Sequence, residues 1–176
     1  MRKRIAIDMD ETICDTLARH LDWYNTEFNQ ALTKADLYAT KLRNKVPEAH
    51  RARVKAYPDM PGFFEDIPPC ENALEVIREL HDSYEILIAT AAMEHPTSFT
   101  PKYEWLVKHL PFISPMNFIF CGKKNVVQAD YLIDDSSRHF EGFVGQGILF
   151  SSPHNLAEVE EVRVNNWLDV RTYFLK

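Results

Sequence analysis

Two acidic motifs follow apolar segments in this chain, and together they could bind a cation. The first apolar segment leads into D-M-D-E-T, which places acidic side chains at Asp8 and Asp10. A later apolar segment ends in the pair Asp134 and Asp135. Residues i and i+2 of a strand point the same way, and ligands bind where the carboxyl ends of parallel strands meet. We expect these carboxylates to converge there, and oxygen ligands without histidine or thiolate favour Mg²⁺.

A threonine and a lysine complete a pattern suited to phosphoryl transfer. Thr90 ends another apolar segment, and Lys124 lies shortly before the fourth one. A hydroxyl and an ammonium beside Mg²⁺ can hold a phosphoryl group, and a carboxylate can attack it to form an aspartyl phosphate. Taken singly, each of these acidic, threonine and lysine residues more often lies in a loop, caps a helix or has a solvated side chain. Their order along the chain, each at or just before a strand, favours a catalytic site.

The spacing of apolar residues predicts an α/β fold with a parallel sheet, because short apolar runs alternate with segments of helical periodicity. The expected strands are residues 5–7, 84–90, 118–121, 131–133 and 147–150. Three helices are expected: one after Pro69, one over residues 165–175, and one that begins at Thr100 and Pro101. In the last of these, Tyr103, Leu106 and Leu110 share the expected buried face.

An excess of chain after the first strand predicts a helical insertion. About fifty residues separate that strand from the helix after Pro69, far more than a strand-to-helix connection needs. Helical periodicity at 17–28 and a second helical segment over 48–57 account for most of this length. We therefore expect a core formed by residues 1–12 and 66–176, with a small helical cap at residues 13–65.

The expected cap is basic, although the whole chain carries a net charge of −6. Residues 41–55 contain six lysines and arginines, with Glu48 as the one acid. This segment could steer an anionic substrate to the site, or it could be a solvated helix surface. Four aromatic residues could likewise stack on a base or pack the cap against the core: Tyr38, Tyr57, Phe63 and Phe64.

Length and composition fit one soluble domain of 176 residues, with 45% apolar and 26% charged residues. No apolar run approaches the roughly 20 residues of a membrane span, and Asp8 interrupts the first one. We therefore expect a cytoplasmic protein with neither a secretion signal nor a membrane partner. The acidic net charge argues against binding of polymeric nucleic acid. Three separated cysteines suggest neither a disulfide framework nor a zinc site. The oligomeric state stays open, a homodimer included.

The order of the four motifs resembles the phosphatases of the haloacid dehalogenase superfamily. Five segments are similar to the 5'(3')-deoxyribonucleotidase family: P-G-F-F-E-D-I-P-P, I-A-T-A-A, K-Y-E-W-L, K-N-V-V-Q-A-D-Y-L-I-D-D and N-W-L-D-V. The resemblance runs from residue 5 to about residue 170, nearly the full chain. It implies a three-layer, Rossmann-like parallel sheet with a small helical cap. It also implies a magnesium-dependent phosphomonoesterase that acts on nucleoside monophosphates, with deoxyribonucleotides expected first.

The resemblance also implies roles for the four aspartates. Asp8 would be the nucleophile and a magnesium ligand. Asp10 would protonate the leaving oxygen and then activate water, while its backbone carbonyl would bind the metal. Asp135 would be the direct metal ligand of the last motif, with Asp134 beside it.

The remaining motifs would hold the phosphate. The resemblance assigns this role to Thr90, to the backbone N–H of Ala91 and to Lys124, with Lys123 as a competing candidate. Some family members carry serine where this chain has Ala91, so one hydroxyl contact to the phosphate is missing. Two further departures lie near the first motif: Glu11 replaces a common glycine, and Thr16 replaces an aromatic residue of the base pocket.

Three other functions remain to be weighed. The same chemistry could act on another small phosphomonoester. A phospho-acceptor signalling domain also uses aspartate, threonine, lysine and magnesium, but its acidic pair ends the first strand and it lacks a long cap insertion. A catalytically silent binding domain is a third alternative, which the intact motifs do not support.

Overall fold

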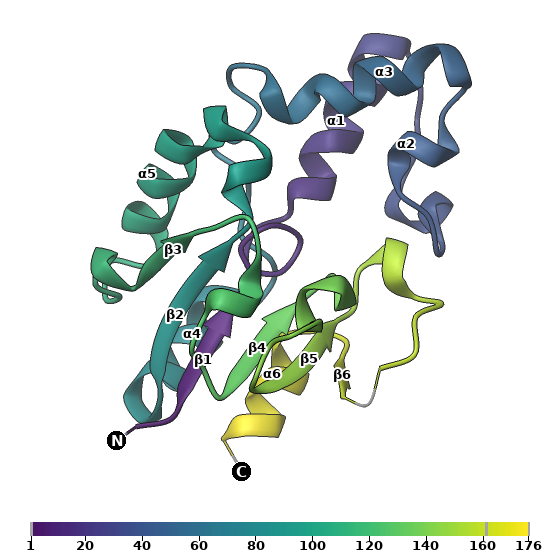
Figure 1. The fold of residues 1–176 in the computed structure, drawn as a ribbon. Helices are drawn as coiled ribbons and strands as arrows, with labels where there is room; N and C mark the ends of the chain where they lie inside the picture. The colour runs from purple at the N-terminus through teal and green to yellow at the C-terminus, as the bar shows by residue number, and fades with distance from the viewer. Residues whose placement is uncertain (1, 161, 176) are drawn as a thin grey trace.

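A computed structural model describes residues 2–160 and 162–175 of the chain. These residues form one six-stranded sheet, parallel throughout, in the order β3-β2-β1-β4-β5-β6 (Figure 1). All five expected strands are confirmed, and β6 was not expected because a strand of two residues shows no periodicity. The strands are β1 Arg4–Ile7, β2 Glu85–Thr90, β3 Phe118–Phe120, β4 Tyr131–Asp134, β5 Gln146–Phe150 and β6 Arg163–Val164.

The central strand β1 is buried on both faces, as expected for a parallel sheet covered on both sides. Ile5, Ala6 and Ile7 are fully inaccessible. Strand β1 pairs with β2 on one side and with β4 on the other. The direction in which strands are added reverses between β1 and β4, and a crevice forms at the carboxyl ends of such strands. Both acidic motifs follow these two strands.

Helices cover one face of the sheet and short turns cover the other. Helices α4 (Ala73–Ser83), α5 (Phe99–His109) and α6 (Trp167–Phe174) contribute to the larger hydrophobic cluster. The smaller cluster lies against the opposite face and takes Val127 and Phe143 from the loops around β4. The third layer is therefore thin and built mostly from 3₁₀ turns.

Helix α5 differs from the sequence-based expectation in its start and in its buried face. It begins at Phe99, so Thr100 and Pro101 lie inside its first turn. Tyr103 is 47% exposed, and the buried face consists of Lys102, Trp105 and Leu106. The expected face was wrong at Tyr103, because the helix turns a lysine inward where periodicity favoured an aromatic residue.

A group of helices lies beyond the carboxyl ends of the strands (Figure 1). It comprises α1 (Thr16–Phe28), α2 (Leu42–Lys45) and α3 (Glu48–Ala56). Asp15 caps α1, because its carboxylate accepts a hydrogen bond of 3.0 Å from the backbone N–H of Ala18. The helices expected over 17–28 and 48–57 are both present, while the division into core and cap stays a prediction. None of the described helices is long and apolar enough to cross a membrane.

Candidate active site

A buried lysine joins the two acidic motifs. The Lys124 ammonium contacts the Asp8 carboxylate and lies 2.5 Å from Asp134 Oδ2. Its side chain is fully buried. The backbones of the two motifs are also hydrogen-bonded to each other, because the Asp8 N–H donates to the carbonyl of Ile133 at 2.9 Å. The structure therefore brings Lys124, and not Lys123, to the motifs, and it confirms that β1 and β4 deliver their acids to one place.

Burial and mutual repulsion strain the carboxylates of this group. Burial, with help from Asp134 and Asp10, raises the pKa of Asp8 to about 6 although Lys124 acts against the shift. Burial also raises the pKa of Asp135 well above its usual range, and the nearby carboxylates of Glu11 and Asp8 add to this. A cation bound at this sheet edge would favour the ionised form of both buried acids.

Asp134 is the best-satisfied acid of the group. Burial alone would raise its pKa, but Lys124 and His139 outweigh burial and lower it. His139 Nδ1 lies 2.9 Å from Asp134 Oδ2, and the Ser136 N–H donates to Oδ1 at 2.9 Å. With each of its oxygens already in contact with the protein, Asp134 is fitted to hold Lys124.

Three carboxylates fit a divalent cation at this position. Oxygens of Asp8, Asp134 and Asp135 lie within 4.8 Å of one another. Hard oxygen donors that carry excess negative charge are what Mg²⁺ binds in proteins. The donor set therefore suits the cation expected from the sequence.

A second lysine, Lys102 of α5, holds the outer acid of the first motif. Its ammonium contacts Asp10, donates to Thr90 Oγ1 at 3.1 Å, and lies 4.6 Å from the centre of the Phe64 ring. Its side chain is only 3% exposed, whereas that of Asp10 is 31% exposed. Thr16 supplies a further hydrogen bond to Asp10 at 2.9 Å. Asp10 thus faces the pocket from a fixed position.

Lys102 has no role in the site predicted from the sequence, although its neighbours along α5 indicate that it is buried. Trp105 and Leu106 lie three and four residues further along α5 on its buried face. A lysine that shares a helix face with two large apolar residues is expected to be buried. A buried lysine in turn indicates an acidic partner nearby. The partner, Asp10, lies 92 residues away in sequence, so spacing alone could not identify it.

The predicted phosphate-binding residues differ in their access to the pocket. Ala91 lines it together with Asp8, Asp10 and Asp135. The Thr90 hydroxyl is buried and accepts the hydrogen bond from Lys102. The structure therefore gathers all seven predicted site residues around one pocket, with Thr90, Lys124 and Asp134 buried beneath its surface.

Glu11 extends the acidic group on the side away from Lys124. Its backbone has φ 56°, a conformation that glycine adopts without strain. Its carboxylate accepts a hydrogen bond of 2.5 Å from Ser152 and lies 3.4 Å from His154 Nδ1. Burial would raise the pKa of Glu11, but the contacts with His154 and Ser152 prevail and lower it to about 2.

The pocket of Asp8 and Asp10 adjoins a second cavity of about 390 Å³ under the helices, because Glu11, His20 and Lys41 line both. Lys41, Arg43 and Lys55 line this cavity, which places half of the basic residues of segment 41–55 beside the site. The other three basic residues of that segment do not line it.

The four aromatic candidates separate into different roles. Tyr38 is 70% exposed, and Tyr57 is buried against Trp23. Phe63 and Phe64 are also buried, and both line the catalytic pocket. Packing therefore explains Tyr57, while Phe63 and Phe64 pack and form a pocket wall at the same time.

Known proteins similar to this chain agree with its geometry. The family model described as "5' nucleotidase, deoxy (Pyrimidine), cytosolic type C protein" matches residues 2–176. The chain belongs to this family. A Bacillus subtilis protein named 5'(3')-deoxyribonucleotidase is 34% identical over 99% of this chain and 100% of its own length. A Staphylococcus aureus protein, provisionally given the same name, is 45% identical over 99% of this chain and 96% of its own.

Solved structures of other hydrolases share the fold of this chain. A haloacid dehalogenase-like hydrolase of Streptococcus pneumoniae matches with a TM-score of 0.63 and 13% identity, covering 98% of each chain. A Bacillus subtilis hydrolase, provisionally assigned to that superfamily and solved with magnesium, has a TM-score of 0.62 and 14% identity over 99% of each chain. At such identities the likeness shows the fold. The protein is accordingly a nucleotidase-family hydrolase with a haloacid dehalogenase-like core.

Proposed function

We propose that this protein is a magnesium-dependent phosphomonoesterase that dephosphorylates deoxyribonucleoside monophosphates. The observation that carries the proposal is the joining of Asp8, Lys124 and Asp134 beside Asp10 at the carboxyl ends of β1 and β4. The relatives named 5'(3')-deoxyribonucleotidase support this choice of substrate. The 390 Å³ cavity next to the acids provides space for the nucleoside.

Asp8 is the proposed nucleophile and Asp10 the proposed acid and base. A carboxylate oxygen of Asp8 attacks phosphorus, and the bond from phosphorus to the nucleoside oxygen breaks. Asp10 gives its proton to that oxygen and later takes a proton from the water that attacks the aspartyl phosphate. Phosphate leaves and Asp8 is restored. Lys102 and Thr16 hold Asp10 in place for both proton transfers.

The remaining residues of the motifs serve charge neutralisation and phosphate binding. Asp8, the backbone carbonyl of Asp10 and Asp135 are the proposed ligands of Mg²⁺, with Asp134 beside them. A bound Mg²⁺ would neutralise the carboxylates and polarise the phosphoryl oxygens. Lys124, Thr90 and the backbone N–H of Ala91 are the proposed phosphate contacts.

The test is phosphate release from a panel of substrates by the full chain. The panel holds deoxyribonucleoside and ribonucleoside monophosphates, with the phosphate at the 5' or 3' position, together with phosphosugars. Each is assayed with Mg²⁺ and with a chelator. We expect magnesium-dependent release that is fastest for the deoxyribonucleotides. Release from phosphosugars alone would contradict the substrate assignment, and release that persists in chelator would contradict the metal requirement.

A further inference from the structure

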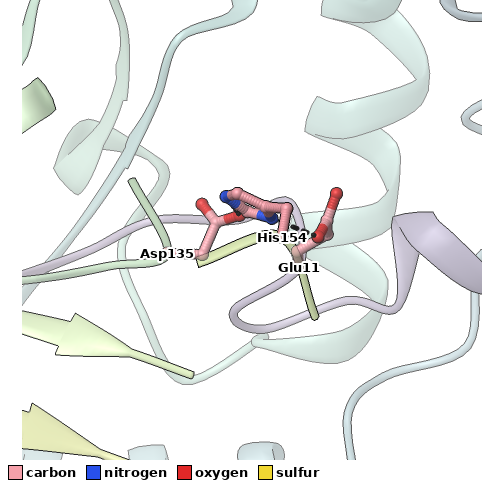
Figure 2. Close-up of side chains that lie close together, drawn as sticks. All are labelled: Glu11, Asp135 and His154. Carbon is pink, nitrogen blue, oxygen red and sulfur yellow. Dashed lines mark ion pairs between the residues drawn. The ribbon is translucent and has the colours of Figure 1, made fainter. Parts of the chain in front are cut away.

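Three side chains from different loops meet beside the catalytic pocket: Glu11, Asp135 and His154 (Figure 2). They follow β1, β4 and β5, so the same sheet edge delivers all three. One possible ligand atom of each lies within 4.8 Å of the others. Nothing in the proposed reaction uses Glu11 or His154.

The His154 ring makes its close contacts through Nδ1, whereas Nε2 faces Asp135 and has no hydrogen-bond partner among the residues that the structure describes. Its Nδ1 lies 3.1 Å from Ser152 Oγ and 3.4 Å from Glu11 Oε2. Its Nε2 is buried without a hydrogen-bond partner, 3.6 Å from Asp135 Oδ2, and the side chain is only 9% exposed. A buried polar atom without a partner costs about 1–3 kcal/mol. Nε2 therefore has its lone pair or its proton directed toward the Asp135 carboxylate, where a bound cation would satisfy both groups.

The distance from Nε2 to Asp135 suits a metal ion better than a proton. A charged hydrogen bond from a protonated imidazole would close it to about 2.7–2.9 Å. Two atoms that each lie about 2.0–2.2 Å from a tetrahedral Zn²⁺ stand roughly 3.3–3.6 Å apart. The Asp135 oxygen at 3.6 Å lies at the upper end of the second range.

The surrounding structure orients this site before any ion arrives. Asn155, which follows His154, donates to the backbone carbonyls of Asp135 at 2.7 Å and Phe150 at 2.8 Å. This ties the histidine segment to the loop that carries Asp135. A carboxylate near the second nitrogen of a metal-binding histidine is a common support for such sites, and Glu11 stands in that position.

Excess negative charge around the pocket favours the binding of a cation. Five carboxylates gather here beside the ammonium groups of two buried lysines: Asp8, Asp10, Glu11, Asp134, Asp135, Lys102 and Lys124. Lys41 adds a further positive charge to the pocket wall, where Glu94 and Arg138 pair with each other. These cations do not balance the carboxylates, so the pocket attracts positively charged ions.

We propose that His154 Nε2 and Asp135, with Glu11 supporting the imidazole from its Nδ1 side, form a second cation site selective for a first-row transition metal such as Zn²⁺. The imidazole nitrogen selects against Mg²⁺, which takes oxygen ligands, and in favour of metals that accept nitrogen. Asp135 has two carboxylate oxygens, so it belongs to this site and to the proposed magnesium site at once. The two cations are therefore expected to influence each other's affinity through Asp135.

The experiment is calorimetric titration of metal-free full chain with Zn²⁺ in saturating Mg²⁺, with metal content counted separately. Wild type should bind one Zn²⁺ per chain. His154→Gln should weaken Zn²⁺ binding by at least about tenfold. His139→Gln is the matched control, because His139 also contacts an acid of the pocket but has its nitrogen paired, and it should retain wild-type affinity. Titration with Co²⁺ adds a spectroscopic measure, since loss of the nitrogen ligand changes its visible absorption.

Equal Zn²⁺ affinity in wild type and His154→Gln would overturn the proposal, as would equal weakening by both histidine variants. If His154→Gln does not fold, Glu11→Gln gives the same test, because it keeps the size of the side chain and removes a charge from the site. Zn²⁺ binding is measured without substrate. A failure of the phosphatase assignment would therefore leave this result intact, and the reverse also holds.

Discussion

The charges at the carboxyl edge of the sheet and those on the helical segment 41–55 are held in opposite ways. At the sheet edge, Lys102 and Lys124 are buried, and each contacts two acceptors. On the helical segment, Arg53 pairs with Glu27, while the other five basic residues form no ion pair within the described part of the chain. Buried, paired charges fix the positions of the side chains that they contact, and they act only over the distance of that contact. Exposed, unpaired charges act over a distance and are screened by salt.

The largest effect is expected for the innermost acid of the sheet edge. Asp8→Asn keeps the size of the side chain but removes the nucleophile, so phosphate release should fall by more than about 10⁴-fold. Lys124 retains Asp134 as a partner, so the fold should persist, which circular dichroism checks. Asp66→Asn, at an exposed acid paired with Lys108, is the control. Activity of the Asp8 variant near that of the control would refute the mechanism.

Lys102 tests whether the second buried pair sets the rate as well. Lys102→Met keeps the length of the side chain and removes the ammonium that holds Asp10, so kcat should fall by about 10²–10³-fold with little change in KM. Lys108→Met changes an exposed lysine of the same helix and should leave both constants unchanged. An unchanged kcat in the first variant would show that Asp10 needs no support from Lys102.

Sequence patterns found the strand ends and their acids because both depend on near neighbours. The apolar run before Asp8 and the one before Asp134 each specify a buried strand, and parallel pairing then determines where the acids meet. The same logic fails for contacts made by distant segments. Glu11 and Ser152 lie 141 residues apart, and no local spacing connects them.

Helix α5 shows a second limit of periodicity. The pattern identified the helix, but it could not choose between Tyr103 and Lys102 for the buried face. Hydrophobicity favoured the aromatic residue. The structure instead buries Lys102, because Asp10 and the ring of Phe64 contact its ammonium group. Functional sites are where prediction of buried residues from hydrophobic periodicity most often fails.

His20 on α1 is a half-buried titratable group of the helical region, and its Nδ1 is a buried atom. Burial lowers its pKa to about 4, although Glu11 and Asp10 act against the shift. The unfolded chain therefore binds a proton near the ordinary value of 6.5, while the folded chain does not. Stability should fall as the pH drops from about 6.5 to 4, by up to about 3 kcal/mol from this residue.

Urea unfolding of wild type and His20→Gln at pH 7 and pH 4.5 measures this contribution. Wild type should lose about 2–3 kcal/mol more than the variant between the two pH values. His81→Gln, on α4 outside both cavities, should follow wild type. Parallel losses in all three proteins would mean that His20 is protonated in the fold.

The smallest effect is expected at the unpaired cations of the helical segment 41–55. Replacing Lys41, Arg43 and Lys55 with glutamine removes three positive charges from the wall of the 390 Å³ cavity. KM for a nucleotide should rise about threefold to tenfold with kcat unchanged, because exposed charges contribute little each and affect approach rather than chemistry. The effect should vanish at high salt.

The other half of the same segment supplies the matched control. Glutamine at Lys45, Arg51 and Arg53 removes the same net charge from residues that do not line the cavity. If the segment attracts substrate only through its total charge, both triple variants will raise KM equally. If the cations at the cavity wall contact the substrate, the first variant will raise KM more than the second. If the difference in KM between the two triple variants persists at high salt, the cations at the cavity wall contact the substrate directly. The helical segment would then act through contacts, as the charges at the sheet edge do.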